Sequence, residues 1–254
     1  MVISNLKGGL GNYLFQIAVG YSLSIDNNVP FMVDINKIRQ VHSHWDTYAD
    51  NIFRNVSVGV NLEILGTYRY ESLTYQPIPY QPNFIVDGYY QSEKYFLNNK
   101  DKVLDLLKID DNSLNYLMEK YPNIVNSENT CSIHVRRGDF LKIPFYNKLD
   151  MSYYNQAIDE IGRDKEFIVF SDDIAWCKAN FTGLNVTFIE GEKDYVDMYL
   201  MSLCKNNITA NSTFSWWGSY LNMNPSKKVV TPNTWFVTLH SNVDIPASDW
   251  IKIM

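Results

Sequence analysis

The residues best suited to chemistry stand in one short segment near the middle of the chain. This segment is His134-Val135-Arg136-Arg137-Gly138-Asp139, and it follows the strand-like run Thr130–Ile133. Alternation with a period of two places Ser132, His134 and Arg136 on one face of the strand. A guanidinium is a planar, permanently charged fork that suits bidentate contact with phosphate. The segment therefore predicts an anion site at the strand end. The alternative is a strand end closed by a salt bridge between Arg137 and Asp139.

Two further polar clusters follow predicted strands in the second half of the chain, Ser171-Asp172-Asp173 and Asn211-Ser212-Thr213. Hydroxyls and free N–H groups at a helix start either cap the helix or bind a diphosphate. A carboxylate at 172 or 173 either caps the next helix or accepts hydrogen bonds from the N1–H and amine of guanine. Because ligands of open α/β sheets bind at the carboxyl ends of the strands, the three clusters predict one site.

A glycine loop near the start of the chain, residues 8–11, joins a predicted strand at 2–6 to a predicted helix at 13–25. Such a unit presents backbone N–H groups to phosphate. The next strand, Phe31–Asp34, ends in an acid, as a dinucleotide-binding fold would require. However, the third glycine of that fingerprint would fall at Leu14. A nicotinamide-dependent oxidoreductase and a non-catalytic glycan-binding protein remain as alternative functions.

Regular alternation of strands and helices after residue 126 predicts a doubly wound parallel sheet. Its strands are expected at 131–136, 167–171, 186–190, 207–210 and 228–231, and its helices at 151–161, 173–180, 194–204 and 213–222. The first half follows the same plan more loosely, with a strand at 84–90, a helix from about 92 to 107 and another from 110 that ends before Pro122. The polar stretch 123–129 predicts a boundary between domains 1–125 and 126–254.

Composition excludes some classes of partner. A net charge of −6 leaves no basic stripe for nucleic acid. No apolar run of about 18 residues is present, and the first residues lack the pattern of a signal peptide. Three scattered cysteines suit reduced thiols. Five glycosylation-type sequons fall largely in or beside predicted strands, which favours a non-secreted bacterial protein. We therefore expect the protein in the cytoplasm or at the inner face of the membrane.

Three segments together resemble the α-1,2-fucosyltransferases of glycosyltransferase family 11. They are Gly8-Gly9-Leu10-Gly11-Asn12-Tyr13-Leu14-Phe15-Gln16, His134–Asp139, and Ala210-Asn211-Ser212-Thr213-Phe214-Ser215-Trp216-Trp217-Gly218. Their order and spacing agree with that family and span nearly the whole chain. One departure is Tyr13, where the family commonly has glutamine. The adjacent Trp216 and Trp217 are expected in the core rather than against a sugar.

The resemblance implies a GT-B fold, in which two Rossmann-like domains face each other across a cleft. It implies inverting transfer of fucose from GDP-β-L-fucose to the 2-hydroxyl of a galactose-terminated oligosaccharide or lipid-linked glycan, as in surface polysaccharide synthesis. Arg136 would contact the β-phosphate, with Asn12 and the glycine loop closing from the other domain. The candidate catalytic residues are Arg136, Asp139 and Asn12. The candidate donor-binding residues are Gly9, Gly11, His134, Arg137, Asp172, Asp173, Asn211, Ser212, Thr213 and Ser215.

No cofactor or metal ion is expected. The chain contains no Asp-x-Asp, the usual means by which a glycosyltransferase holds a divalent ion on a nucleotide diphosphate. Arginine and helix N–H groups would then stabilise the diphosphate charge. The catalytic base is the least determined role. Asp139 is one candidate and the alternative is that it only orients Arg137, while Glu93, His42 and Asp34 are other candidates. His42 and His44 could also ligate a metal, although a surface loop near the acceptor is the preferred interpretation.

Overall fold

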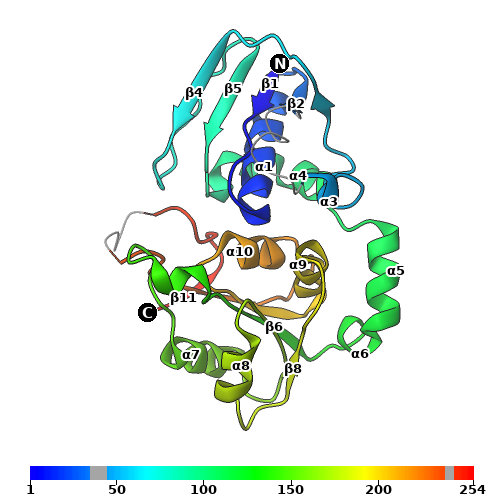
Figure 1. Ribbon diagram of the computed structural model, residues 1–254, viewed down its shortest axis with the longest axis vertical. Helices are drawn as coiled ribbons and strands as arrows, with labels where there is room; N and C mark the ends of the chain where they lie inside the picture. The colour runs from blue at the N-terminus through cyan, green and yellow to red at the C-terminus, as the bar shows by residue number, and fades with distance from the viewer. Residues whose placement is uncertain (35–44, 238–242) are drawn as a thin grey trace. The chain divides into compact units, whose positions relative to one another are not determined.

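The computed structural model describes residues 1–34, 45–237 and 243–254, which form two compact units (Figure 1). Unit 1 comprises Met1–Asp110 and Val243–Ala247, and unit 2 comprises Asp111–Asn242 and Ser248–Met254. Each unit contains one parallel sheet with helices packed on it. The predicted α/β class with two Rossmann-like domains is confirmed.

The sheet of unit 2 has the strand order β11-β10-β9-β6-β7-β8. Its strands are β6 (Thr130–Val135), β7 (Glu166–Ser171), β8 (Val186–Phe188), β9 (Asn206–Ile208), β10 (Val229–Pro232) and β11 (Ile251–Ile253). All of these pairings are parallel. Counted along the chain, this is the dinucleotide-fold order 3-2-1-4-5-6, which reverses between the first and fourth strands. Here the reversal lies between β6 and β9.

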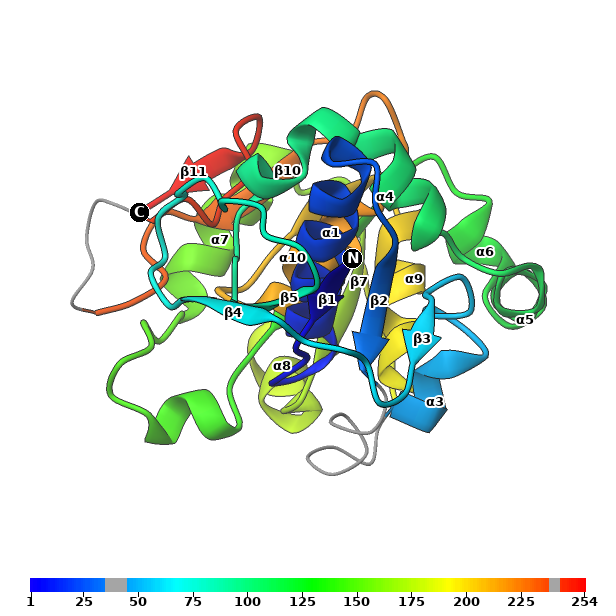
Figure 2. The ribbon, with the colours of Figure 1, turned by 90° about the horizontal axis from the view of Figure 1, so that it is seen from above.

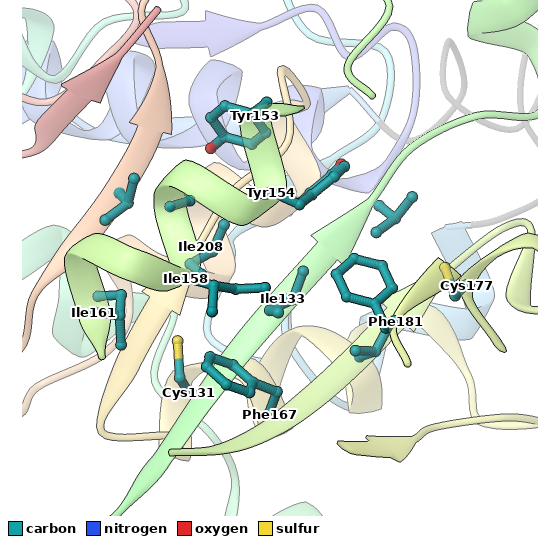
Figure 3. Packing of buried hydrophobic residues seen from close by; sticks show 14 residues of the cluster. Cys131, Ile133, Tyr153, Tyr154, Ile158, Ile161, Phe167, Cys177, Phe181 and Ile208 are labelled. Atoms are coloured by element: carbon teal, nitrogen blue, oxygen red, sulfur yellow. The ribbon is translucent and has the colours of Figure 1, made fainter. Parts of the chain in front are cut away.

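One face of this sheet is covered by α7 (Met151–Ile161) and α8 (Ile174–Asn180) (Figures 1 and 3). Asp150 caps α7 by accepting a hydrogen bond of 2.9 Å from the Ser152 N–H. The buried residues of α7 recur at helical spacing and pack on the alternate β6 residues Cys131, Ile133 and Val135. The predicted alternation of β6 is therefore confirmed. All three cysteines are buried free thiols.

The other face is covered by α9 (Asp194–Leu203) and α10 (Thr213–Tyr220), which pack on each other (Figure 1). A Cβ at Gly218 would lie 2.9 Å from the Met201 sulfur, so glycine allows this close approach. Trp216 and Trp217 are fully buried, which confirms their predicted place in the core.

The sheet of unit 1 has the order β3-β2-β1-β5-β4, with β1 central (Figure 2). Its strands are β1 (Val2–Ser4), β2 (Phe31–Asp34), β3 (Val58–Gly59), β4 (Gly66–Tyr70) and β5 (Phe84–Gly88), all parallel. Helix α1 (Leu10–Asp26) packs on β1. Strands β1 and β5 are neighbours in this sheet although they are not consecutive in the chain.

The remaining elements of unit 1 are short: α3 (Trp45–Ala49), η1 (Glu93–Tyr95), η2 (Leu97–Asn99) and α4 (Lys100–Leu106). The segment 243–247 also belongs to this unit. Ile245 and Ala247 are fully buried, and Asp244 accepts hydrogen bonds from the Tyr75 N–H at 2.7 Å and the Lys94 ammonium at 2.6 Å.

Two differences from the sequence prediction concern the helix after β5 and the division between the units. The expected continuous helix from 92 to 107 is broken, because the backbone of Phe96 is not helical. The centroid of the Phe96 ring lies 6.3 Å from that of Phe15. The two units also divide at 110 rather than at 125. Helices α5 (Asp111–Lys120) and α6 (Pro122–Val125) belong to unit 2, where Tyr121 donates a hydrogen bond of 2.7 Å to Glu192.

Candidate active site

The three predicted polar clusters follow β6, β7 and β9, and these strands are neighbours in the sheet of unit 2. All three strands run in the same direction, so the clusters lie at one edge. The chain leaves β6 and β9 in diverging directions at the strand-order reversal, which is where doubly wound folds bind nucleotides. The clusters after β6 and β9 flank this point.

Arg136 is held by two carboxylates. Its Nη2 donates to Asp139 Oδ1 at 2.7 Å, and its Nη1 lies 3.2 Å from Asp172 Oδ2. The guanidinium also lies over the Phe140 ring, 5.3 Å from the centroid. The side chain is 33% exposed. A guanidinium has five N–H donors, so these contacts fix its plane and leave donors for an anion.

Arg137 has different partners. Its backbone N–H donates to Asp172 Oδ1 at 2.8 Å and its Nε donates to Asp173 Oδ2 at 3.1 Å. Its guanidinium lies 4.1 Å from the centroid of the Trp176 ring. The expected salt bridge between Arg137 and Asp139 is therefore wrong, because Asp139 bonds Arg136 instead.

Gly138 explains part of this arrangement. Its backbone has φ 6° and ψ −106°, which turns the chain into the short helix η3 (Asp139–Lys142). A Cβ at this position would lie 2.5 Å from Asp172 Oδ2. Glycine therefore lets the Asp172 carboxylate approach both arginines.

Asp172 and Asp173 are engaged within the protein. Besides binding Arg137, Asp173 caps α8 by accepting a hydrogen bond of 3.1 Å from the Trp176 N–H. The capping alternative is thus observed. Recognition of guanine by either carboxylate stays a prediction, and it would require sharing the oxygens that now accept from the arginines.

The cluster after β9 shapes the loop more than it faces solvent. Asn211 is 2% exposed and donates to the carbonyls of Asn147 at 2.8 Å and Trp235 at 2.9 Å. Ser212 caps α10, and the Ser215 hydroxyl bonds backbone groups of the same turn. Thr213 is half-buried at the helix start.

His134 lies next to this turn, with its ring 5.3 Å from that of Phe214. It is 5% exposed, and within the described residues its Nδ1 has no hydrogen-bond partner. Burial, with the nearby charge of Arg136, lowers the pKa of His134 to about 3. The imidazole is therefore neutral at physiological pH and contributes no positive charge to the site.

The glycine loop of unit 1 precedes α1, which begins at Leu10 rather than at 13. Gly8 has φ +91°, and Gly9 is the N-cap residue, with open space where a Cβ would be. Gly11 is buried in the first turn. The Asn12 side-chain oxygen accepts a hydrogen bond of 2.8 Å from Gln91.

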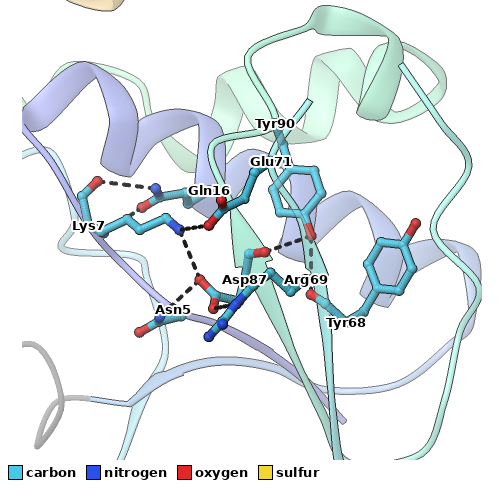
Figure 4. A network of polar contacts seen from close by, with 8 residues as sticks. All are labelled: Asn5, Lys7, Gln16, Tyr68, Arg69, Glu71, Asp87 and Tyr90. Carbon is cyan, nitrogen blue, oxygen red and sulfur yellow. Dashed lines mark hydrogen bonds and ion pairs between the residues drawn. The ribbon is translucent and has the colours of Figure 1, made fainter. Parts of the chain in front are cut away.

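A polar network at the end of β5 was not predicted from the sequence (Figure 4). Asp87 is 4% exposed and accepts from Arg69 at 2.8 Å and Asn5 at 3.2 Å, with the Lys7 ammonium at 3.2 Å. Burial alone would raise the pKa of Asp87, but these contacts outweigh it and lower the pKa. The available signal was a carboxylate within an otherwise apolar strand.

This network positions the glycine loop. The Gln16 side chain accepts from the Lys7 N–H at 2.9 Å and donates to the Lys7 carbonyl at 3.1 Å. Asp87 holds the other end of the same lysine. Both contacts fix the residue that leads directly into Gly8.

The other candidate bases, Glu93 and Asp34, are buried in unit 1. His42 and His44 lie outside the described residues. Within residues 1–34, 45–237 and 243–254 no group of three potential metal ligands is found. No helix in this described part of the chain is both long enough and apolar enough to cross a membrane.

Comparison with solved structures supports the fold class. The fucosyltransferase NodZ from Bradyrhizobium aligns with a TM-score of 0.57 and 14% identity, over 85% of this chain and 91% of that chain. At this identity the likeness shows the fold alone, and it confirms the predicted GT-B class. The chain therefore has a GT-B fold in which Arg136 lies at the end of a strand of unit 2.

Sequence comparison gives the family. The model of glycosyl transferase family 11 matches residues 61–254. An alpha-1,2-colitosyltransferase of Escherichia coli is 31% identical over 100% of this chain and 99% of its own length. The O-antigen biosynthesis glycosyltransferase WbnK of Escherichia coli is 29% identical over 98% and 99%. The chain belongs to glycosyl transferase family 11, which confirms the resemblance and does not favour the two alternative functions.

Proposed function

We propose that the protein transfers L-fucose from GDP-β-L-fucose, with inversion, to the 2-hydroxyl of a terminal galactoside. The main support is Arg136, held between Asp139 and Asp172 where the strand order reverses. The GDP co-crystallised with NodZ and the O-antigen and α-1,2 relatives indicate the donor nucleotide, the linkage and a role in O-antigen synthesis.

In the proposed reaction the bond between the fucosyl anomeric carbon and the diphosphate oxygen breaks as the acceptor oxygen attacks from the opposite face. Negative charge grows on the departing GDP, where an oriented guanidinium stabilises it. The half-buried start of α10, in the same unit as Arg136, offers N–H groups for the same charge. No metal ion is needed in this scheme.

A base must take the acceptor proton. Asp139 bonds Arg136 and is largely exposed, so its first role in this proposal is to orient that arginine. The acceptor is a galactose-terminated oligosaccharide or a lipid-linked glycan.

A second donor is favoured by one observation. The full-length relative at 31% identity is a colitosyltransferase, so the donor sugar could be colitose instead of fucose. The same site chemistry serves both donors, because the leaving group is unchanged.

The test measures nucleotide binding and transfer together. Calorimetric titration with GDP, UDP and NAD should show binding of GDP alone. Purified protein is then incubated with GDP-fucose or GDP-linked colitose and a panel of galactose-terminated acceptors, and NMR assigns the new linkage. We expect an α-1,2 product from one of the two donors. Preferential binding of NAD, or a product linked at another hydroxyl, would refute the proposal.

A matched control separates the site from general effects of losing an arginine. Arg163 donates to Asp159 at 2.6 Å at the far end of α7, away from the carboxyl edge of the sheet. Arg163→Ala should bind GDP normally, whereas Arg136→Ala should bind it at least tenfold more weakly.

A further inference from the structure

The loop between β6 and α7 contains an unusual exposed apolar surface. Residues 141–145, Leu-Lys-Ile-Pro-Phe, are exposed without interruption. Leu141, Ile143 and Phe145 are 40%, 38% and 43% exposed, and neighbouring Val237 is 45% exposed. We call these four side chains the apolar ridge. Exposed apolar side chains that gather in one patch often mark a site of interaction with a protein or a membrane.

The ridge is a built structure. The rings of Phe140 and Tyr146 are stacked with centroids 3.8 Å apart and an interplanar angle of 1°. Tyr146 forms a bridge with Phe236, and the Val237 N–H donates to the Phe145 carbonyl at 3.0 Å. These aromatic contacts, with that of Phe145 on Phe236 at 4.6 Å between ring centroids, and the backbone hydrogen bond fix the segments that carry the exposed side chains.

The charges around the ridge are basic, although the chain as a whole carries −6. Lys142 and Lys148 are exposed, and neither forms an ion pair within the described residues. The acidic residues of the same loop are engaged, since Asp139 bonds Arg136 and Asp150 caps α7. The apolar ridge, whose side chains can enter a bilayer, therefore lies beside lysines that form no ion pair within the described residues.

We propose that the apolar ridge inserts into the surface of a lipid bilayer rich in anionic headgroups. Leucine, isoleucine and phenylalanine partition into the interface, while lysines beside them bind lipid phosphates at about 1 kcal/mol each. Four side chains are too few for a stable protein interface, which needs about 800 Å² from each partner.

The location gives this contact a function. Asp139 begins η3 and bonds Arg136, so the ridge and the arginine belong to one loop. Bilayer contact would place that loop at the surface where a lipid-linked acceptor is anchored. This consequence rests on the proposed function, whereas binding to the bilayer does not.

The test is flotation of the whole protein with vesicles. Phosphatidylcholine vesicles are compared with vesicles containing about a third phosphatidylglycerol. Wild-type protein should float with the anionic vesicles, and the double variant Leu141→Glu with Ile143→Glu should lose at least tenfold in partitioning. Lys142→Gln should lose about fivefold. Met223→Glu is the control, because Met223 is 71% exposed elsewhere in unit 2.

Three outcomes would overturn the proposal. They are equal partitioning of wild type and double variant, an equal loss in Met223→Glu, and binding only when the vesicles contain a lipid-linked glycan. A dimer in ultracentrifugation that the double variant loses would also overturn it, by assigning the ridge to self-association. Transfer to a soluble galactoside is measured on the same samples. Failure of the proposed function would abolish that transfer and leave flotation intact.

Discussion

Replacement of Arg136 by lysine tests how the leaving group is stabilised. Lysine keeps the charge but cannot reproduce a planar fork that is fixed by Asp139 at 2.7 Å and Asp172 at 3.2 Å. Loss of one preorganised donor to a developing oxyanion costs about 10²–10³ in rate. Because lysine keeps the charge, we expect the smaller of these rate losses. The kcat should fall about 10²-fold, which corresponds to about 2.7 kcal/mol of transition-state stabilisation.

The assay is the initial rate of transfer at saturating GDP-fucose, with GDP affinity measured by calorimetry. Arg137→Lys is the companion variant, because Arg137 lies on Trp176 and bonds Asp173. The Arg137→Lys substitution should mainly lower the melting temperature, because lysine has no planar group to stack on the Trp176 ring. A kcat within threefold of wild type in Arg136→Lys would refute the reasoning, as would an equal rate loss in Arg137→Lys without a change in melting temperature.

Three further predictions concern Asp139, metal ions and Asp197. Asp139→Asn should raise the KM for GDP-fucose while kcat keeps its pH profile, because Asp139 orients Arg136. If the variant instead loses the fall of kcat at acidic pH and its kcat drops by about 10²–10⁴-fold, Asp139 is the base. Activity should survive EDTA, and an enzyme that is inactive until Mg²⁺ or Mn²⁺ is restored would contradict the arginine-based scheme. Asp197 has an Oδ1 without a partner within the described residues, and burial, with Glu192 and Asp194 nearby, raises the pKa of Asp197 to about 7. The pKa in the folded protein lies above the usual value of an aspartate, about 4, so the wild type loses stability as pH rises from about 4 through 7. Asp197→Asn should remove this dependence of the free energy of unfolding on pH and stabilise the protein at pH 8 by about 1–3 kcal/mol. The measurement is urea unfolding of wild type and variant at pH 5 and pH 8. A variant no more stable than wild type at pH 8 would show that the Asp197 carboxylate is solvated.

Strong periodic patterns made most of unit 2 predictable. The strands β6 and β7 and the helix α7 fell within a residue of their expected bounds, because their buried faces repeat clearly along the sequence. Strand β4 was missed because only every other residue of this edge strand is partly buried and none is fully so. The three-residue strand β11 is too short to show a period.

The site was predicted at the level of segments but not of pairings. Sequence order placed Arg136, Arg137 and the acids at one sheet edge, since parallel strands must end together. Which arginine meets which acid depends on the turn at Gly138 and on a partner 35 positions away, at Asp172. The network around Asp87 was not predicted for the same reason. Its partner Arg69 lies on β4, a strand that was not predicted from the sequence.

The segment 243–247 affects the order in which the chain can fold during synthesis. Unit 1 includes Met1–Asp110, yet its buried Ile245 and its anchor Asp244 are made only after residues 111–242 of unit 2. Domains that lie wholly upstream can fold while the ribosome is still translating. Here the first unit stays incomplete until nearly the whole of unit 2 has been made. A stop codon just before Val243 would therefore leave both units unfinished, one without its anchor and the other without β11.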